Sequence, residues 1–557
     1  MEKIWQKHYD PEVPESISYP EVTLNDIFRR SVEDHPGGVA TIFVGAKIKY
    51  GDLGKLVDRF AAGLAGLGVK QGDRVAIILP NLPAYPIAHF AVLKLGAILV
   101  PTNPLYVARE LEHQLNDAGA ETVIVLDQLY PRLLEVRHQT RVKRLILIRV
   151  KDFLPGLVGF LYGLKNKSHA KTDEAAGVYT YRDLMRRSSA STPEARVSPE
   201  DTAIFLYTGG TTGVSKGAVL THRNLVVNVY QTRKWLATLK EKKEVILCVL
   251  PFFHSYGMTT GMHLAVLSRS TMLLQPRFEL KDVIKQIKKH RPTIFCGIPS
   301  MYNAINRSPG LSGSDVSSVR LCVSGGAALP GEVQKQFESL TGGRLVEGYG
   351  LSECSPLTHV NPIHGRRKNG TIGVPVSDTD ARVLDPETRE PLPAGQVGEL
   401  AVKGPQVMKG YWQMPEESEQ VLSDGWLYTG DMAVMDEDGF FTIVDRKKDL
   451  IISAGMNIYP REIEEVLHQH PKVREAAVVG APSSVREEIV KAYVVIEPGQ
   501  ELTKNEVIQF CRDRLAKFKV PRQVEFVQEL PKSTVGKILK RELRSGVLKP
   551  STVPSRE

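Results

Sequence analysis

Apolar and polar positions follow two periods along the first 150 residues. Apolar residues recur at helical spacing from Leu53 to Leu67 and again from Leu111 to Ala118. Short continuous apolar runs lie between and after them, at residues 75–79, 98–101 and 122–126, and they have the length of buried strands. Strands that alternate with helices through short turns are typical of a mainly parallel sheet covered by helices.

The same pattern continues to about residue 375 and then changes. Residues 293–299 and 320–324 are predicted as further strands, whereas residues 375–445 carry short β-like segments and turns. A dense charge cluster ends this stretch, and helix and strand patterns follow it. A chain of 557 residues is too long for one core. We predict an α/β fold, with a large domain of parallel-rich sheets plus a small β subdomain (residues 1–445) and a small, mobile α+β domain (residues 446–557).

One glycine-rich stretch separates two apolar runs. It reads Tyr-Thr-Gly-Gly-Thr-Thr-Gly-Val-Ser-Lys from Tyr207 to Lys216. Exposed backbone N–H groups, hydroxyls and a lysine are the groups that hold a polyphosphate. The spacing is not that of the common P-loop, in which Gly, Lys and Ser or Thr are contiguous. A flexible surface turn is the alternative.

Glycines and polar residues also follow two predicted strands. Residues 325–330 read Gly-Gly-Ala-Ala-Leu-Pro, and residues 347–353 read Glu-Gly-Tyr-Gly-Leu-Ser-Glu. Ligands of α/β proteins bind at the carboxyl ends of strands. The hydroxyl and carboxylate of the second segment suit Mg²⁺ beside phosphates. Residues 428–431, Tyr-Thr-Gly-Asp, are predicted as a turn whose Asp431 accepts from ribose hydroxyls, and an ordinary aspartate turn is the alternative.

Two apolar segments allow two interpretations each. Residues 254–262 combine a histidine, aromatics, glycines and methionines, which suits the wall of an apolar pocket or simple core packing. Residues 149–172 combine an apolar, aromatic run with flanking lysines. Such a segment is too short to span a bilayer, so it lies either in the interface of an anionic membrane or against the protein itself.

Net charge and cysteine content bear on the binding partners and the cellular compartment of the protein. The formal net charge of +9 suggests anionic partners, although so small an excess also fits solubilising charge alone. The five cysteines are scattered without metal-ligand spacing, which indicates reduced, buried thiols. The N-terminus lacks the apolar core of a signal peptide, and no window has the length of a spanning helix. We expect a cytoplasmic protein, or one on the inner face of the membrane, that binds no nucleic acid.

Taken together and in this order, the motifs resemble those of the adenylate-forming superfamily of acyl-CoA synthetases, luciferases and adenylation domains. Two further motifs extend the resemblance, Asp-Arg-Lys-Lys-Asp from residue 445 and Pro-Lys-Ser-Thr-Val-Gly-Lys from residue 531. Within the superfamily the chain looks most like bacterial long-chain fatty acid–CoA ligases. The resemblance implies that a medium- or long-chain fatty acid first attacks ATP to give acyl-AMP and pyrophosphate. Coenzyme A then takes the acyl group and releases AMP.

The resemblance also implies roles for individual residues. Those predicted to act in catalysis are Lys537, His254 and Glu353, and those predicted to hold Mg²⁺ are Thr208 and Glu353. The predicted ATP and coenzyme A contacts are Thr208, Gly209, Gly210, Thr211, Thr212, Gly213, Lys216, Gly325, Gly326, Ala327, Glu347, Gly348, Tyr349, Gly350, Ser352, Asp431, Arg446, Lys448 and Gly455. The acyl site is predicted to include His254, Tyr256, Gly257, Met258 and Met262.

Other functions stay open at this point. An adenylating enzyme that loads a carrier protein, or one that uses an aryl acid, would carry the same motifs. A non-catalytic acyl-adenylate sensor is disfavoured, because Lys537, Glu353 and Asp431 are all present. A homodimer and a peripheral contact with an anionic membrane are compatible with the sequence.

Overall fold

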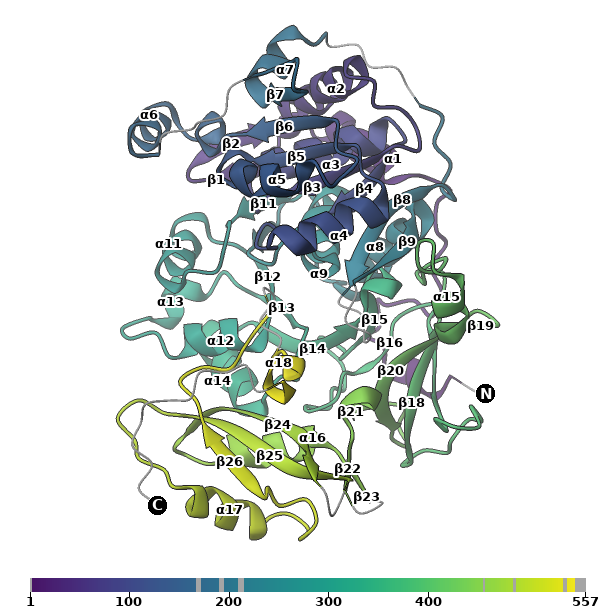
Figure 1. Ribbon diagram of the computed structural model, residues 1–557, viewed down its shortest axis with the longest axis vertical. Helices are drawn as coiled ribbons and strands as arrows, with labels where there is room; N and C mark the ends of the chain where they lie inside the picture. Colours follow the sequence, from purple (N-terminus) through teal and green to yellow (C-terminus); the bar gives the residue numbers. More distant parts are fainter. Residues whose placement is uncertain are drawn as a thin grey trace. The chain divides into compact units, whose positions relative to one another are not determined.

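The computed structural model describes residues 3–166, 172–189, 195–208, 215–453, 456–483, 487–533 and 538–545 (Figure 1). The chain divides into two compact units. The first comprises residues 1–380 and 402–427, and the second comprises residues 381–401 and 428–557.

A nine-stranded sheet forms one half of the first unit. Its strands, in spatial order, are β16 (Val374–Pro375), β15 (Leu357–Val360), β14 (Arg344–Gly350), β13 (Leu321–Ser324), β12 (Ile294–Gly297), β10 (Val245–Cys248), β11 (Thr271–Leu274), β1 (Val39–Phe43) and β2 (Ala46–Lys49). The strands from β14 to β1 are parallel to one another, and antiparallel pairs close the sheet at both ends.

A seven-stranded sheet forms the other half. Its spatial order is β7 (Val178–Thr180), β6 (Arg144–Ile148), β5 (Thr122–Leu126), β3 (Arg74–Ile78), β4 (Ile98–Pro101), β8 (Thr202–Thr208) and β9 (Lys216–Thr221). Every neighbouring pair is parallel except the hairpin of β8 and β9. The carboxyl ends of six strands therefore meet at one edge of this sheet.

Helices cover both sheets (Figure 1). Those of the first unit are α1 (Leu24–Asp34), α2 (Tyr50–Gly66), α3 (Ala84–Lys94), α4 (Ala108–Ala118), α5 (Tyr130–Arg137), α6 (Gly156–Lys165), α7 (Tyr181–Arg187), α8 (His222–Trp235), α9 (Ser255–Gly257), a π-helical segment (Met258–His263), α10 (Leu264–Ser268), α11 (Leu280–His290), α12 (Pro299–Asn306), α13 (Gly313–Val316), α14 (Gly331–Thr341) and α15 (Pro415–Val421). Every residue of α3 from Ala84 to Leu93 is buried, so this helix is enclosed on all sides.

The second unit contains the C-terminal sheet. Its strands are β23 (Met456–Ile458), β22 (Ile451–Ser453), β25 (Glu487–Ile496), β24 (Val473–Ser483) and β26 (Gln523–Phe526), and its helices are α16 (Pro460–His468), α17 (Lys504–Arg512) and α18 (Lys540–Arg544). A further small sheet consists of β17 (Asp380–Leu384), β18 (Val397–Lys403), β20 (Trp426–Met435), β19 (Leu422–Ser423) and β21 (Phe441–Arg446), with most of its residues in the second unit.

The predicted fold class is confirmed, since both large sheets are parallel-rich and a smaller β-rich unit follows. The predicted helices at 53–67 and 111–118 correspond to α2 and α4. The predicted strands at 75–79, 98–101 and 122–126 correspond to β3, β4 and β5. The division of the chain at residues 445 and 446 stays a prediction.

Candidate active site

The two ends of the glycine-rich segment face each other across a hairpin. Thr208 ends β8 and lies opposite Lys216, which begins β9. The strand forms because residues 203–206 are apolar and buried. Because β8 runs parallel to β4, Thr208 lies at the carboxyl edge of the sheet, where α/β proteins bind ligands.

A second segment of the first unit packs against this hairpin. The backbone N–H of Val219 donates to the carbonyl oxygen of Gly410 at 2.9 Å, and that of Trp412 donates to Gly217 at 2.8 Å. The backbone N–H of Met408 donates to the carbonyl oxygen of Glu353 at 2.8 Å. These backbone bonds hold Glu353, which is far away in sequence, near the start of β9.

Tyr411, in the same segment, connects Glu353 with Lys216. Its hydroxyl donates to Glu353 Oε1 at 2.8 Å, and Lys216 Nζ lies 5.4 Å from the centre of its ring. Burial and the neighbouring carboxylate of Glu353 raise the pKa of Tyr411, so the phenol stays protonated and keeps its donor. One aromatic side chain thus orients the carboxylate and contacts the cation of the predicted phosphate site.

The oxygen donors at this place suit Mg²⁺. A glutamate carboxylate and a threonine hydroxyl are hard ligands, and Mg²⁺ in nucleotide sites takes one or two such groups together with phosphate oxygens. Among the residues described, no three histidine, cysteine, aspartate or glutamate side chains are grouped closely enough to hold a metal by themselves. A metal bound by Thr208 and Glu353 would therefore need the phosphates as further ligands.

The predicted adenine loop, residues 325–330, leaves the carboxyl end of β13. Glu347 Oε2 accepts the backbone N–H of Leu329 at 3.0 Å, which ties the loop to β14. Tyr256 donates its hydroxyl to the carbonyl oxygen of Val323 at 2.7 Å, and a Cβ on Gly325 would lie 3.0 Å from the Tyr256 ring. A side chain at Gly325 would have to displace this ring, whereas Gly326 and Ala327 are exposed.

The residues that follow lie in or beside β14, which continues through Gly350. A Cβ on Gly350 would lie 2.1 Å from the carbonyl oxygen of Pro356, so only glycine fits this crossing of the two backbones. Tyr349 is half-buried, and the centre of its ring lies 5.9 Å from that of His359 in a T-shaped arrangement. Ser352 Oγ lies 3.3 Å from Ser255 Oγ, so this motif contacts the predicted acyl segment.

The predicted acyl segment begins at His254. The Nδ1 atom of His254 accepts the backbone N–H of Tyr256 at 3.3 Å and caps the short helix α9. A Cβ on Gly257 would lie 2.4 Å from the carbonyl oxygen of Pro251, so the chain can turn here only without a side chain. Met258 and Met262 are buried in the π-helical segment that follows. π-Helical turns are rare and frequent at functional sites.

In the second unit, Asp431 and Arg446 lie opposite each other on β20 and β21. Their ion pair joins Arg446 Nε and Asp431 Oδ1 at 3.4 Å. The prediction of a turn at 428–431 is wrong, because these residues lie within the strand β20, whose pairing with β21 begins at Asp431. Lys448 follows in a 3-10 turn, and burial and the nearby Arg446 lower the pKa of its ammonium group.

Seven of the predicted site residues lie outside the described part of the chain. These are Gly209, Gly210, Thr211, Thr212, Gly213, Gly455 and Lys537.

A family model described as AMP-binding enzyme matches residues 28–412, and a model of the AMP-binding enzyme C-terminal domain matches residues 462–537. This chain belongs to the AMP-binding enzyme family. It is similar to a long-chain-fatty-acid–CoA ligase of Bacillus subtilis, with 45% identity over 97% of this chain and 98% of the relative. It is 41% identical to a long-chain-fatty-acid–CoA ligase of Escherichia coli O6:H1 over 98% of both chains. Among solved structures, ATP-bound MatB from Rhodopseudomonas palustris matches with a TM-score of 0.84 and 30% identity, over 94% of this chain and 99% of that one.

Tyr411 is the residue of this AMP-binding enzyme that sequence reasoning missed. It lies 58 positions from Glu353, in a loop without a recognisable motif. The only available signal was the aromatic pair Tyr411-Trp412 after a glycine. Trp412 serves the fold, since it stacks on Phe205 at 4.4 Å and donates to the carbonyl oxygen of Asp117.

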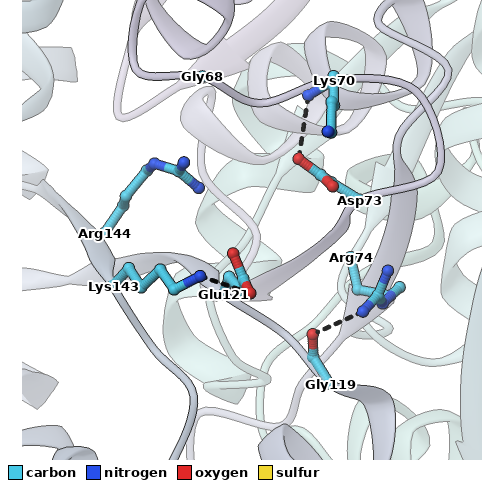
Figure 2. Close-up of a pocket in the computed structure, with 8 residues that line it drawn as sticks. All are labelled: Gly68, Lys70, Asp73, Arg74, Gly119, Glu121, Lys143 and Arg144. Carbon is cyan, nitrogen blue, oxygen red and sulfur yellow. Dashed lines mark hydrogen bonds and ion pairs between the residues drawn. The ribbon is translucent and has the colours of Figure 1, made fainter.

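The pocket in Figure 2 lies elsewhere on the enzyme. It has a volume of about 440 Å³, and its lining is Gly68, Lys70, Asp73, Arg74, Gly119, Glu121, Lys143 and Arg144. Lys143 pairs with Glu121 at 2.8 Å, and Arg74 donates to the carbonyl oxygen of Gly119. These residues stand at the amino ends of β3, β5 and β6, at the opposite edge of the sheet from Thr208. The pocket is therefore separate from the candidate active site.

Proposed function

We propose that this AMP-binding enzyme is a fatty acid–CoA ligase that converts a medium- or long-chain fatty acid, ATP and coenzyme A into acyl-CoA, AMP and pyrophosphate. The observation that carries the proposal is the arrangement of Thr208, Lys216 and Glu353 around Tyr411 at the carboxyl edge of a parallel sheet. The choice of a fatty acid is supported by the similarity to long-chain ligases over nearly the full chain.

The first half-reaction brings two anions together. A carboxylate oxygen attacks the α-phosphorus of ATP, the bond to the β-phosphate oxygen breaks, and pyrophosphate leaves. Positive charge must compensate the growing charge on the phosphates. In our proposal Lys216 and the N–H groups of residues 208–213 hold the β- and γ-phosphates, and Lys537 bridges the carboxylate and the α-phosphate. Thr208 and Glu353 would hold a magnesium ion, which would supply further charge compensation.

The remaining groups bind the nucleotide and the acid. We assign the adenine to Gly325, Gly326 and Ala327, with Tyr349 stacking on its ring and Glu347, Gly348 and Gly350 behind. The exposure of Gly326 and Ala327 supports this assignment. The chain of the acid is assigned to the segment from His254 to Met262, where Ser255 contacts Ser352.

In the second half-reaction the thiol of coenzyme A attacks the acyl carbonyl and AMP leaves. We assign the ribose hydroxyls to Asp431, whose ion pair with Arg446 fixes its position, and coenzyme A contacts to the loop at Gly455. Lys448 is proposed as the hinge about which residues 446–557 turn between the two steps.

The proposal extends to the location and the oligomeric state of the enzyme. We infer a protein of the cytoplasm that meets the inner face of the membrane, either as a monomer or as a homodimer. No helix among the described residues has both the length and the apolarity to cross a bilayer.

Pyrophosphate release measured over acids from acetate to oleate, with and without coenzyme A, tests the proposal. We expect release with medium- or long-chain acids and a thioester product when coenzyme A is present. Glu353→Gln is the matched control, because it removes the charge of the carboxylate and keeps the shape of the side chain. No release with any acid would contradict the proposal. Release without thioester formation would favour an enzyme that loads a carrier protein, and release with aryl acids only would favour the aryl-acid alternative.

A further inference from the structure

The helix α6 turns its large apolar side chains outward. Leu157, Phe160, Leu161 and Leu164 are 74%, 65%, 56% and 64% exposed. Their spacing of i, i+3, i+4 and i+7 places them on one face of the helix. A helix that packs its apolar face on a core shows the opposite arrangement, so this face contributes little to folding.

Two glycines of α6, Gly159 and Gly163, lie on the face toward the protein. A Cβ on Gly159 would lie 3.1 Å from the carbonyl oxygen of Lys151, and one on Gly163 would lie 3.6 Å from the Lys151 side chain. Tyr162 accepts a hydrogen bond from Gln128 at 2.8 Å. The helix is thus held to the 3-10 turn Val150–Phe153 through its small residues, and it lies at the margin of the first unit (Figure 1).

The exposed apolar side chains are concentrated on this helix. Five of the thirteen large apolar side chains that are exposed in the described residues belong to α6, the fifth being Val158. Contiguous exposed apolar surface marks a site of contact with another molecule or a membrane.

The charges near α6 favour an anionic surface as the partner. The sequence from Phe153 to Thr172 contains no aspartate or glutamate and three lysines. The preceding acid, Asp152, pairs with Arg149 at 3.1 Å. An apolar helix face with basic neighbours is typical of helices that lie in the interface of an anionic bilayer, where cationic side chains meet the headgroups.

The place of α6 in the fold relates it to the active site. The helix begins after β6, which runs parallel to β5, β3, β4 and β8 in turn. The carboxyl end of β6 therefore lies at the same edge of the sheet as Thr208, which ends β8. A bilayer on α6 would approach the edge that carries the phosphate site.

We propose that α6 is a membrane-docking helix, which inserts Leu157, Phe160, Leu161 and Leu164 into the interface of an anionic bilayer. This inference rests on the proposed function, because a fatty acid substrate partitions into that bilayer and docking brings the enzyme to it. Insertion transfers four large side chains from water to hydrocarbon.

The test is cosedimentation of the full-length protein with vesicles of phosphatidylcholine, with and without phosphatidylglycerol. We expect binding mainly to the phosphatidylglycerol vesicles. The variant Phe160→Asp/Leu164→Asp should lower the partition coefficient by about tenfold or more. Val397→Asp/Phe518→Asp is the matched control, because it adds the same charge at side chains of the second unit that are 37% and 38% exposed. It should change binding by less than about twofold.

Three results would overturn the proposal: no binding of the wild type to anionic vesicles, equal binding by the α6 variant, or equal losses in both double variants. A change from dimer to monomer in the α6 variant with unchanged vesicle binding would instead assign the face to a second copy of this chain. The ligase reaction with decanoate in the absence of vesicles separates the two proposals. We expect the α6 variant to retain it, and its absence from the wild type would contradict the proposed function while leaving the docking result intact.

Discussion

Replacing Tyr411 by phenylalanine removes one hydrogen bond and little else. The hydroxyl donates to Glu353 Oε1 at 2.8 Å, whereas the ring that lies 5.4 Å from Lys216 Nζ is retained. The change therefore isolates the orientation of the carboxylate from the contact with the cation. We expect weaker binding of Mg²⁺ and ATP, because Glu353 is then free to rotate away from the metal.

The size of the effect follows from the geometry. A hydrogen bond to a charged group contributes about 1.5–3 kcal/mol when buried. Both Tyr411 and Glu353 are only half-buried, so about 1–1.5 kcal/mol is the appropriate range. Since about 1.4 kcal/mol corresponds to a factor of ten, kcat/KM for Mg·ATP should fall about five- to tenfold. The assay is pyrophosphate release at saturating fatty acid while Mg·ATP is varied.

A double-mutant cycle separates this explanation from a general loss of packing. On the Glu353→Gln background the charge is already gone, so Tyr411→Phe should cost less than about twofold more. An equal loss in both backgrounds, or wild-type activity of Tyr411→Phe alone, would refute the reasoning.

Three further predictions concern other parts of the molecule. Lys537→Ala should abolish formation of acyl-AMP yet spare thioester synthesis from pre-made acyl-AMP; equal losses in both half-reactions would contradict the assigned role. Gly257→Ala should destabilise the first unit by about 2 kcal/mol or more in urea unfolding, since its Cβ would lie 2.4 Å from the carbonyl oxygen of Pro251. Gly37→Ala, with no atom within 4 Å, is the control and should be nearly neutral. Burial lowers the pKa of His263 from 6.5 to about 3. The unfolded chain therefore binds this proton first as the pH falls. Stability should decrease from about pH 6.5 downward by up to about 1.4 kcal/mol per pH unit, and His263→Gln should show a shallower decrease in the urea midpoint.

The secondary structure of the large sheets was predictable because it rests on local patterns. The runs at 75–79 and 98–101 are apolar at every position and the run at 122–126 at every position after Thr122, as is typical of buried parallel strands, and all three form strands. One segment departs from its local pattern. Residues 428–431 contain the turn residues Thr, Gly and Asp but continue the strand β20, because the pairing of Asp431 with Arg446 on β21 outweighs the local preference.

The assembly of the site depended on contacts between distant residues. Thr208 and Lys216 are recognisable from their own motif, and so is Glu353. Tyr411 joins Glu353 to Lys216 because residues 408–412 pair with β9 through their backbones. No local sequence pattern predicts this pairing. Tyr256 is similar, since the hydrogen bond of its hydroxyl to β13 and the contact of its ring with Gly325 join residues far apart in the sequence.

The sequence alone determined the periodicities of the strands and helices, the glycine-rich loop and the order of the motifs, because these depend on residues close together in the chain. It also left open whether residues 149–172 pack on the protein or face outward. Only the tertiary structure decided this, because burial depends on what the rest of the chain places beside a helix. In α6, Gly159 and Gly163 face the protein and the leucines face outward, an orientation that the apolar composition of the segment could not reveal.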